Sequence, residues 1–475
     1  MRKIFVGMIA ILASTMTLWA ERVSEADAAL IANNFMNVAP ATTGSAQVAA
    51  PVKRMVRKAV NTTTAEPQYY LYENADGEGW VIIAANDAVT PVLAYSETGH
   101  FRTDNMPSNI RHWMGLYDRF ITKIEADGVV ASEEAKAEWD GLRKPVRKAK
   151  AATVVGPLIE TKWDQGSPYN NLCPGTGSDK AYTGCVATAM AQIMNYWEWP
   201  VNGTGSHSYK PLDPNSTWGA SSKRYTSTLS ANFGNTTYDW ANMRDKYTYI
   251  SRFSGQYTEY ATVTDDEKTA VATLMYHVGV ACEMMYGNDD DGGSGTYTLN
   301  YGDWSDDQSI QSAIVKYFKY KKSGLTGYMR DGYTYGRTTY YEKWNDEDWT
   351  AMVKAELDKG RPILYGGGDE DGSGGHSFIC DGYNSNDYFH FNWGWSGYND
   401  GLFKLSSLTL GSGGAGGGSF EFSYNQDVLI GIEPDRPEGI EEIQYTEKAT
   451  KVLQDGQVLI LRGDDVYNLM GQKIK

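Results

Sequence analysis

Cysteine and histidine are scarce in this chain, which has four cysteines and six histidines among its 475 residues. Four cysteines are too few for a disulfide-dense scaffold. Six histidines leave few choices for a general base. No phosphate-binding Walker loop, dinucleotide fingerprint or zinc-ligand spacing is present either, and we therefore expect no cofactor.

Basic residues are outnumbered, because 43 Lys and Arg stand against 59 Asp and Glu, which gives a net charge of −16. Nucleic acids and anionic membrane surfaces repel such a chain, so we expect neither as a partner. Beyond the N-terminus no apolar run approaches the roughly 20 residues that a membrane helix needs. We therefore expect no membrane span.

The first 20 residues have the pattern of a signal peptide. Arg2 and Lys3 precede the apolar run Ile4–Ala13, which is too short for a membrane span, and Ala20 supplies a small residue before a cleavage site. The sequence therefore predicts a signal peptide over residues 1–20 and an exported mature chain.

Cys185 stands at the start of a predicted helix. Apolar side chains recur on one face of residues 186–197, and Pro200 ends the pattern. In the first turn of a helix, unpaired backbone N–H groups and the positive end of the dipole favour a thiolate, so we expect a lowered pKa for this thiol. Taken alone, a cysteine in this place is more often a small core residue.

His376 is the candidate base. It follows a pair of glycines and precedes the apolar run Ser377–Tyr383, which predicts a strand. The Gly-rich acidic stretch 366–375 before it is expected to be a solvated loop rather than a metal site, because its spacing does not match a calcium-binding loop. His390 is a rival base, but alternation places it in the middle of the next predicted strand, where a structural role is favoured.

The strand Tyr388–Trp393 supplies candidates for the third member of a catalytic set. The side-chain carbonyl of Asn392 could fix the tautomer of His376. Trp393 and Trp395 compete for this role, although such a pair would ordinarily form part of a core.

Four motifs together resemble the streptopain family of secreted bacterial cysteine proteases. They are Lys162–Asn170, Thr183–Ala189, Gly374–Phe378 and Phe391–Gly397, and they spread over about residues 155 to 435. The resemblance implies an α+β, papain-like fold of two subdomains, in which a helix carries the cysteine and an antiparallel sheet carries the histidine. It also implies secretion or display on the bacterial cell surface.

The resemblance implies a role for each of five residues. Cys185 would be the nucleophile, and His376 the general base and then acid. Gln165 would donate its side-chain amide to the oxyanion, together with the backbone N–H of Cys185. Asn392 comes first as the residue that orients His376, and Trp393 comes second. Substrates would be proteins or peptides, with an apolar side chain preferred just upstream of the scissile residue.

Residues 21–150 resemble the inhibitory prodomain of streptopain-like precursors. Two amphipathic helices and three short strands between them give this region enough apolar pattern for a small α+β core. The helices are predicted near Ser24–Met36 and 109–126, and the strands near 69–72, 79–85 and 91–95. We therefore expect the chain's own prodomain to act as an intramolecular inhibitor.

The basic stretch Arg143–Lys150 stands out in an acidic chain. Such a stretch at a domain boundary indicates a solvated linker, and solvated linkers are cleaved readily. We therefore expect an activation linker near residues 143–152, with cleavage between about Lys144 and Gly156. An ordinary spacer between two permanent domains is the alternative.

The remaining boundaries follow from the motifs and from composition. A peptidase domain is expected over residues 151–435 and a tail over 436–475, with a hairpin near 452–462 turning at Asp-Gly. The tail resembles short segments that sort secreted bacterial proteins to the surface, and a final hairpin packed on the peptidase is an equal alternative. With Cys185 used for catalysis, the other three cysteines could form one bridge at most.

The sequence thus predicts a secreted cysteine endopeptidase that uses a Cys–His thiolate mechanism and is made as an inactive precursor, activated when its prodomain is removed. Two other functions stay open. The same Cys–His pair supports acyl transfer, as in transglutaminase-like enzymes, and a protease fold that has lost activity can serve as a surface binding module.

Overall fold

The computed structural model describes residues 21–37, 55–58, 66–75, 77–103, 106, 108–144, 152–211, 225, 227–250, 257–288, 293–302, 304–368, 375–405, 426–436, 450–454, 457–462 and 465–467. The signal peptide predicted over residues 1–20 and most of the predicted activation linker lie outside these ranges. The chain divides into two compact units, Met1–Pro434 and Asp435–Lys475, each with its own internal contacts. Each unit is described by itself.

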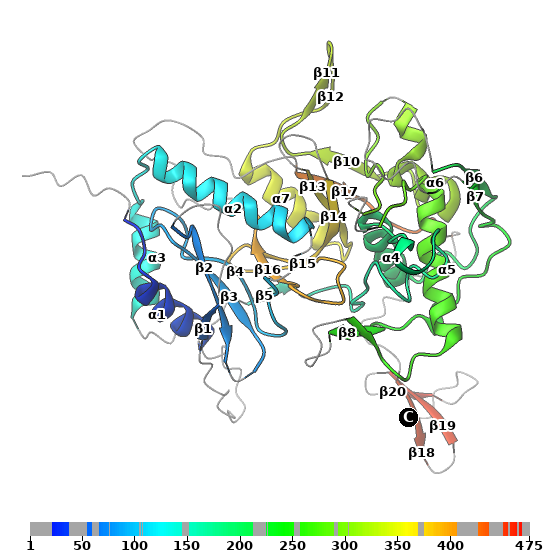
Figure 1. Cartoon of the computed structure of the whole chain (residues 1–475), viewed down its shortest axis with the longest axis horizontal. Helices are drawn as coiled ribbons and strands as arrows, with labels where there is room; N and C mark the ends of the chain where they lie inside the picture. The colour runs from blue at the N-terminus through cyan, green and yellow to red at the C-terminus, as the bar shows by residue number, and fades with distance from the viewer. Residues whose placement is uncertain are drawn as a thin grey trace, which may run out of the picture. The chain divides into compact units, whose positions relative to one another are not determined.

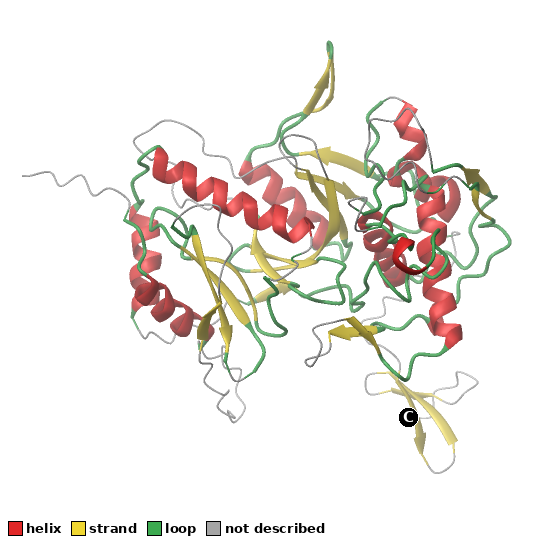
Figure 2. Ribbon diagram, viewed as in Figure 1, coloured by secondary structure: helices red, strands yellow, loops and turns green. Residues whose placement is uncertain are grey.

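The first unit contains seven α-helices among its described residues, shown in Figures 1 and 2. They are α1 (Glu25–Met36), α2 (Ser108–Ala126), α3 (Glu133–Arg143), α4 (Cys185–Trp197), α5 (Asp265–Ala281), α6 (Ile310–Phe318) and α7 (Asp346–Leu357). Side chains cap several of them, as at α5, where Thr264 and Glu267 form a reciprocal capping box.

One large sheet runs through the first unit. Its strands lie in the order β1-β2-β3-β4-β16-β15-β14-β13-β17-β10, and β5 pairs with β14 beside this path. Their bounds are β1 (Met55–Lys58), β2 (Tyr69–Asn74), β3 (Trp80–Ala84), β4 (Val92–Ser96), β5 (Thr153–Val155), β10 (Thr326–Met329), β13 (Ile363–Gly368), β14 (Gly375–Asn384), β15 (Tyr388–Asn392), β16 (Gly401–Lys404) and β17 (Gln426–Ile430). Three short hairpins lie outside this sheet: β6 (His207–Tyr209) with β7 (Leu229–Ala231), β8 (Thr248–Ile250) with β9 (Tyr257–Glu259), and β11 (Tyr333–Tyr335) with β12 (Thr338–Tyr341).

The N-terminal region is joined to the rest by strand pairing. β4 pairs antiparallel with β16, so that Tyr95 lies opposite Leu402 and Ala94 opposite Phe403. Tyr117 on α2 adds a hydrogen bond from its hydroxyl to the carbonyl of Lys404, at 3.1 Å. The predicted prodomain and the predicted peptidase domain therefore share one continuous sheet.

The two faces of β13, β14 and β17 pack against different helices. In the observed register Leu364 lies opposite both Ile379 and Leu429, and these side chains belong to the core that contains α4. We call this side the α4 face. Neighbouring residues alternate to the other side, where Phe378 and Tyr365 pack with α2 and α7. We call that side the α2 face.

An aromatic cluster fills the α2 face. The indole of Trp113 on α2 is 1% exposed, and its ring lies edge-on to four aromatic rings of the sheet. The ring centroids lie 5.0 Å from Phe391, 6.0 Å from Phe378, 6.2 Å from Trp393 and 6.4 Å from Tyr365. The N-terminal region thus anchors a large side chain in the core of the sheet of the predicted peptidase domain.

Most sequence predictions of local structure are confirmed. The helices expected near Ser24–Met36, 109–126 and 186–197 are α1, α2 and α4, and the three expected N-terminal strands are β2, β3 and β4. The expected α+β architecture is confirmed as well. A small α+β region comes first in the chain, and the region after it carries the cysteine on a helix and the histidine on an antiparallel sheet. The loop expected over 366–375 is wrong at its start, because Gly366–Gly368 continue β13 and pair with β14.

The second unit contains a three-stranded antiparallel sheet in its described residues. Its strands are β18 (Thr450–Gln454), β19 (Gln457–Arg462) and β20 (Asp465–Tyr467). The predicted hairpin near 452–462 corresponds to β18 and β19. Over the described ranges of the whole chain, we find no helix that combines the length and the apolar character of a membrane-spanning segment.

Replacing Trp113 by Ala should destabilise the precursor by about 3–5 kcal/mol, because a large buried aromatic side chain is lost from the centre of the α2 face. Urea unfolding of the full chain, carried in a Cys185→Ala background so that no self-cleavage intervenes, measures the change. Tyr335→Ala is the matched control, since that ring is 73% exposed and its loss should stay within about 0.5 kcal/mol. Equal effects of both changes would contradict the role given to Trp113.

Candidate active site

Cys185 is the first residue of α4, and the turn before it is tightly constrained. Gly184 adopts a φ of 88°, which strains any other residue, and a Cβ at this position would lie 2.8 Å from the sulfur of Met284 and would displace that side chain. Thr188 donates its hydroxyl to the carbonyl of Gly184 at 3.0 Å and lies 2.8 Å from the hydroxyl of Thr183. The Thr-Gly-Cys motif therefore positions the thiol by both sterics and hydrogen bonds.

The backbone of β14 reaches the thiol directly. The N–H of Ser377 donates to Sγ of Cys185 at 3.4 Å, so the residue after His376 touches the candidate nucleophile. His376 lies opposite Gly367 on β13, and alternation assigns it to the α2 face with Phe378, while Ser377 belongs to the α4 face. The candidate base and the candidate nucleophile are thus both brought to the start of β14. The side chain of His376, however, is assigned to the α2 face, whereas Cys185 lies on the α4 face.

The thiol pKa differs from the sequence expectation. Burial raises the pKa of Cys185 and outweighs the backbone N–H groups of Ser377, Val186 and Cys185 itself, which lower it, and the Asp427 carboxyl raises it further. The expected lowering by the helix start is therefore wrong for the intact chain. The physical reason is that removing the charged form from water costs more than a few N–H groups return.

The Gln165 segment is held by a buried carboxylate. Oδ1 of Asp164 accepts the N–H of Gln165 at 2.7 Å and the N–H of Gly166 at 3.1 Å, and Oδ2 accepts the hydroxyl of Ser396 at 2.9 Å. The N–H of Thr183 donates to the carbonyl of Gln165 at 3.1 Å. This last bond ties the Gln165 segment to the turn that carries Cys185.

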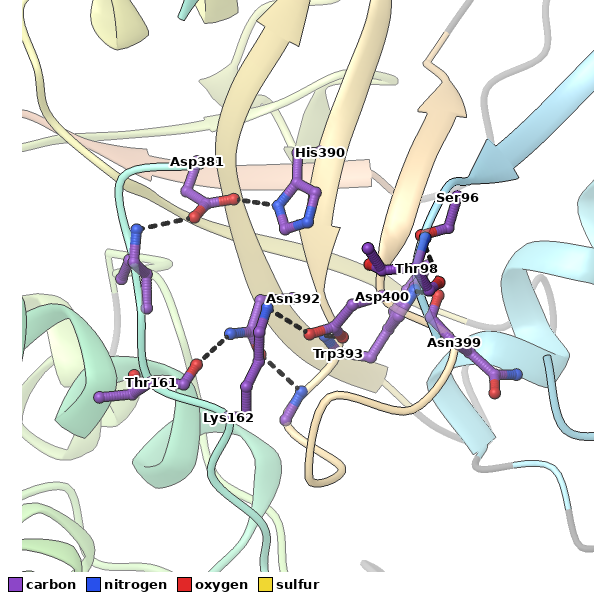
Figure 3. Close-up of polar contacts among 12 residues, drawn as sticks. Ser96, Thr98, Thr161, Lys162, Asp381, His390, Asn392, Trp393, Asn399 and Asp400 are labelled. Carbon is purple, nitrogen blue, oxygen red and sulfur yellow. Dashed lines mark hydrogen bonds and ion pairs between the residues drawn. The ribbon is translucent and has the colours of Figure 1, made fainter. Parts of the chain in front are cut away.

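Asn392 is held by hydrogen bonds of its side chain. Its Nδ2 donates to the carbonyl of Thr161 at 2.8 Å, and its Oδ1 accepts the N–H of Gly394 at 3.1 Å (Figure 3). Nδ2 also lies 3.3 Å from Oε1 of Gln192. Gln192 on α4 also accepts the N–H of Trp163 at 3.2 Å. Asn392 therefore links β15, α4 and the segment that leads to Gln165.

Trp393 is fully buried, and its ring belongs to the aromatic cluster of the α2 face. Its indole N–H donates to the carbonyl of Asn399 at 3.1 Å, and its backbone N–H donates to Asp400 at 3.0 Å (Figure 3). The ring centroid lies 4.5 Å from that of Phe378, which is two residues after His376. Trp393 thus packs beside the strand that carries the candidate base.

Two further polar pairs fasten the segment before Gln165. His390 contacts Oδ1 of Asp381 at 2.6 Å, and the other oxygen of Asp381 accepts the N–H of Ile159 at 2.9 Å. Lys162 forms an ion pair with Asp400 at 3.0 Å. Figure 3 shows both pairs flanking Asn392. The structural role expected for His390 fits this arrangement.

Sequence reasoning missed several residues that build the site. Asp164 lies inside a recognised motif, yet its buried acceptor role was not visible from its position in a polar stretch. Ser377 contributes only a backbone N–H, which no side-chain pattern reveals. Asp427 comes from the last strand of the first unit, far from every motif, and only its place directly before the apolar residues Val428–Ile430 could have indicated it.

All four cysteines, Cys173, Cys185, Cys282 and Cys380, are free thiols. The one bridge that the sequence left open is therefore not formed. Within the described ranges, no three or more His, Cys, Asp or Glu side chains gather in a way that could hold a metal ion.

Comparison with known families gives two matches, which cover separate parts of the chain. Residues 163–403 match the peptidase C10 family, and residues 20–121 match the Spi protease inhibitor family. The first match contains Gln165, Cys185 and His376, and the second covers α1, β1 to β4 and most of α2.

Curated relatives agree with the peptidase match. The chain is 31% identical over 446 residues to the thiol protease/hemagglutinin PrtT of Porphyromonas gingivalis, which covers 91% of this chain and 44% of that protein. It is 28% identical over 378 residues to streptopain of Streptococcus pyogenes, which covers 77% of this chain and 80% of streptopain. The chain thus spans less than half the length of the first relative.

A solved structure supports the fold. A fragment of prointerpain A from Prevotella intermedia, with a cysteine-to-alanine substitution, superposes with a TM-score of 0.57 and 32% identity, over 81% of this chain and all of the fragment. The papain-like fold with a preceding prodomain, expected from the sequence, is confirmed by this similarity.

In the intact precursor, alkylation of Cys185 by iodoacetamide should be slow at neutral pH and should accelerate only above the ordinary thiol range. The reason is the raised thiol pKa, which leaves less thiolate at a given pH. The rate can be followed by mass spectrometry of the Cys185 peptide between neutral and alkaline pH. The same cysteine in urea-unfolded chain is the control and should follow an ordinary thiol profile. A rate that is already maximal at neutral pH in the folded precursor would contradict the burial argument.

Proposed function

The chain belongs to the peptidase C10 family of cysteine peptidases, and from this premise we propose that it is the inactive precursor of a secreted endopeptidase in which Cys185 is the nucleophile. The observation that carries the proposal is the meeting of three segments at one thiol. The Thr183–Gln165 backbone bond joins the oxyanion candidate to the nucleophile turn, and Ser377 brings the strand of His376 to the sulfur.

In the proposed reaction the Cys185 thiolate attacks the carbonyl carbon of a peptide bond. The side-chain amide of Gln165 and the N–H of Cys185 donate to the oxyanion, and imidazolium His376 gives its proton to the leaving amine as the C–N bond breaks. A water molecule, deprotonated by His376, then attacks the thioester and releases the acid product and the thiolate. No cofactor enters these steps.

The precursor does not present this machinery in its reactive form. The thiol pKa is raised, and strand alternation assigns His376 to the α2 face rather than to the face of Cys185. Both features disfavour a thiolate–imidazolium pair. We therefore propose that the active arrangement forms only after the N-terminal region is removed.

The contacts of the N-terminal region support its role as an intramolecular inhibitor. It extends the peptidase sheet through β4 and β16 and inserts Trp113 among the rings of β14 and β15. Arg102 and Asn399 exchange two hydrogen bonds, at 2.9 and 3.1 Å, beside the loop that follows Trp393. Cleavage in the basic linker near residues 143–152 would free these contacts to separate.

Asn392 and Trp393 are proposed as positioning residues. The hydrogen bonds of Asn392 hold the segment before Gln165 and the start of the loop after β15, which supports a role in shaping the oxyanion side of the site. The ring of Trp393 packs on Phe378 and so supports the strand of His376. We keep Asn392 as the first candidate for orienting His376 and Trp393 as the second.

Export is the remaining part of the proposal. The pattern of residues 1–20 supports a signal peptide. The enzyme would therefore be secreted or held at the bacterial cell surface, and it would cleave proteins outside the cell that makes it. The tail 436–475 is proposed as a sorting segment.

Cys185→Ala should abolish both self-processing and casein cleavage. The purified full chain is incubated under reducing conditions, and its fragments are followed by gel and intact mass. The parent should release an N-terminal piece of about 130 residues, as the domain sizes imply, and then cleave casein, while the variant stays whole. Trypsin nicking of the basic linker is the control for access, because it should activate the parent and leave the variant inactive. If neither chain cleaves casein after nicking, the peptidase proposal fails, and the hypothesis of a surface binding module takes its place.

Gln165→Ala should lower kcat of the processed enzyme by about 10²–10³-fold, because one oxyanion donor is lost. Asp164→Asn should cause a smaller loss, since it weakens the acceptor that holds the Gln165 segment and leaves the donor present. Steady-state kinetics on one peptide measure both. Asp387→Asn, on the turn between β14 and β15, is the control for charge. A loss for Asp164→Asn that equals or exceeds that for Gln165→Ala would contradict the division of roles.

A further inference from the structure

Four residues lie in one row across the α4 face of the sheet. Ser377 on β14 lies opposite Gly366 on β13, Gly366 lies opposite Asp427 on β17, and Asp427 lies opposite Met329 on β10. Residues paired across antiparallel strands project to the same face. Since Ser377 touches the sulfur of Cys185, the row begins at the candidate nucleophile and reaches an acidic side chain two strands away.

The carboxyl group of Asp427 lies over Gly366. A Cβ on Gly366 would come well inside contact distance of Oδ1 and to 2.9 Å from Oδ2, so the glycine leaves the space that the carboxyl occupies. Asp427 therefore leans along the row toward Ser377. This direction brings a negative charge toward the reacting sulfur.

One oxygen of this carboxyl receives no hydrogen bond from the part of the chain that the structure describes. Oδ1 of Asp427 is buried and unpaired with respect to the described residues. Burial alone raises the pKa of this carboxyl to about 7. A buried carboxylate without a donor is costly, and a charged donor from a ligand would relieve that cost.

Tyrosines border the carboxyl. Burial raises the pKa of Tyr301 and of Tyr341, and the charge of Asp427 adds a smaller increase to each. The ring centroids of the two tyrosines lie 6.4 Å apart. The hydroxyls of Thr298 and Ser377 lie 3.1 Å apart and hold the segment of Tyr301 beside the row. Aromatic rings near a carboxylate can add cation–π attraction to the binding of a cation.

We propose that Asp427 is a specificity-determining residue, whose carboxylate accepts the cationic side chain of a substrate lysine or arginine close to the scissile bond. This inference rests on the proposed peptidase function and deepens it. It departs from the apolar preference that the family resemblance implies. A subsite for an apolar side chain would carry no charge, whereas this row carries the carboxyl group of Asp427. The substrate cation supplies the donor that Oδ1 lacks.

The test compares arginine with citrulline, which has nearly the same shape and no charge. Fluorogenic peptides that carry either residue at one position, on each side of the scissile bond in turn, are cleaved by the processed enzyme. At one position kcat/KM should be about 30-fold or more higher for arginine, the size expected for a desolvated charge pair. Asp427→Asn should bring the two peptides close to equality at that position.

Two further variants make the comparison specific. Glu342→Gln removes an exposed negative charge next to Tyr341 and should leave the arginine-to-citrulline ratio unchanged, because solvent screens that charge. Gly366→Ala keeps the charge of Asp427 but displaces its carboxyl, and should lower the ratio. Thermal unfolding of each variant shows that the fold is retained.

The ratio should also depend on pH. Asp427 is ionised above its pKa of about 7, so the arginine preference should be full above this pH and should be lost as the pH falls through it. The other titratable groups that face it are Cys185 of α4 and Tyr301 and Tyr341 of the segments covering the row, whereas alternation assigns Tyr365 and His376 of the adjacent strands to the α2 face. Burial raises the pKa of the thiol and of the three tyrosines away from neutrality, and effects on catalysis common to both peptides cancel in the ratio.

The outcomes separate the two proposals. If the parent cleaves the citrulline peptides but shows no preference for arginine at any position, or if Asp427→Asn keeps that preference with the fold intact, the specificity inference is overturned and the peptidase proposal stands. If the processed parent cleaves neither set and behaves like Cys185→Ala, both proposals fail. An arginine preference that Asp427→Asn and low pH both remove supports the inference.

Discussion

The register between β13 and β14 is the constraint on which the site depends. With Gly366 opposite Ser377 and Gly367 opposite His376, the backbone presents Ser377 to Cys185 and assigns the neighbouring histidine to the other face. A slip by one residue would exchange every side chain between the faces. The packing of Leu364 and Ile379 against the α4 core opposes such a slip, because it would place apolar and aromatic sets in each other's cores.

Burial decides the charge states around the thiol. The same removal from water raises the pKa of Cys185, of Asp164 and of Asp427, although the first two accept backbone N–H bonds that act in the opposite direction. For Asp164 the burial serves position, since a carboxyl with three donors fixes the Gln165 segment. For Cys185 it suppresses reactivity, which suits a precursor that must not cleave itself out of turn.

Local pattern was enough to predict much of this molecule. The period of residues 186–197 and the glycine before Cys185 specify a helix that starts at the thiol, and the apolar strands near 69–95 need no distant information. Pairing between Tyr95 and Leu402 joins segments far apart in the sequence, so the shared sheet of the N-terminal region and the peptidase region was not visible. The continuation of β13 through three glycines was missed because glycine disfavours strands locally, and cross-strand pairing overrides this preference. The thiol pKa was mispredicted since dipole and N–H effects are local, whereas burial depends on the whole fold.

The row from Cys185 to Asp427 couples reactivity to substrate choice. Burial is the main reason for the raised pKa of the Cys185 thiol, and the negative charge of Asp427 raises it a little further, so an enzyme without a bound cation has a less ionised nucleophile. A lysine or arginine side chain bound at Asp427 would neutralise this charge and remove its effect on the thiol, by the same Coulombic interaction with opposite sign. Binding energy at the subsite would then be used partly to form the thiolate, which is an interaction that assists the chemical step and not only the affinity. Gly366 makes this coupling possible, because any side chain at that position would push the carboxyl away from the sulfur.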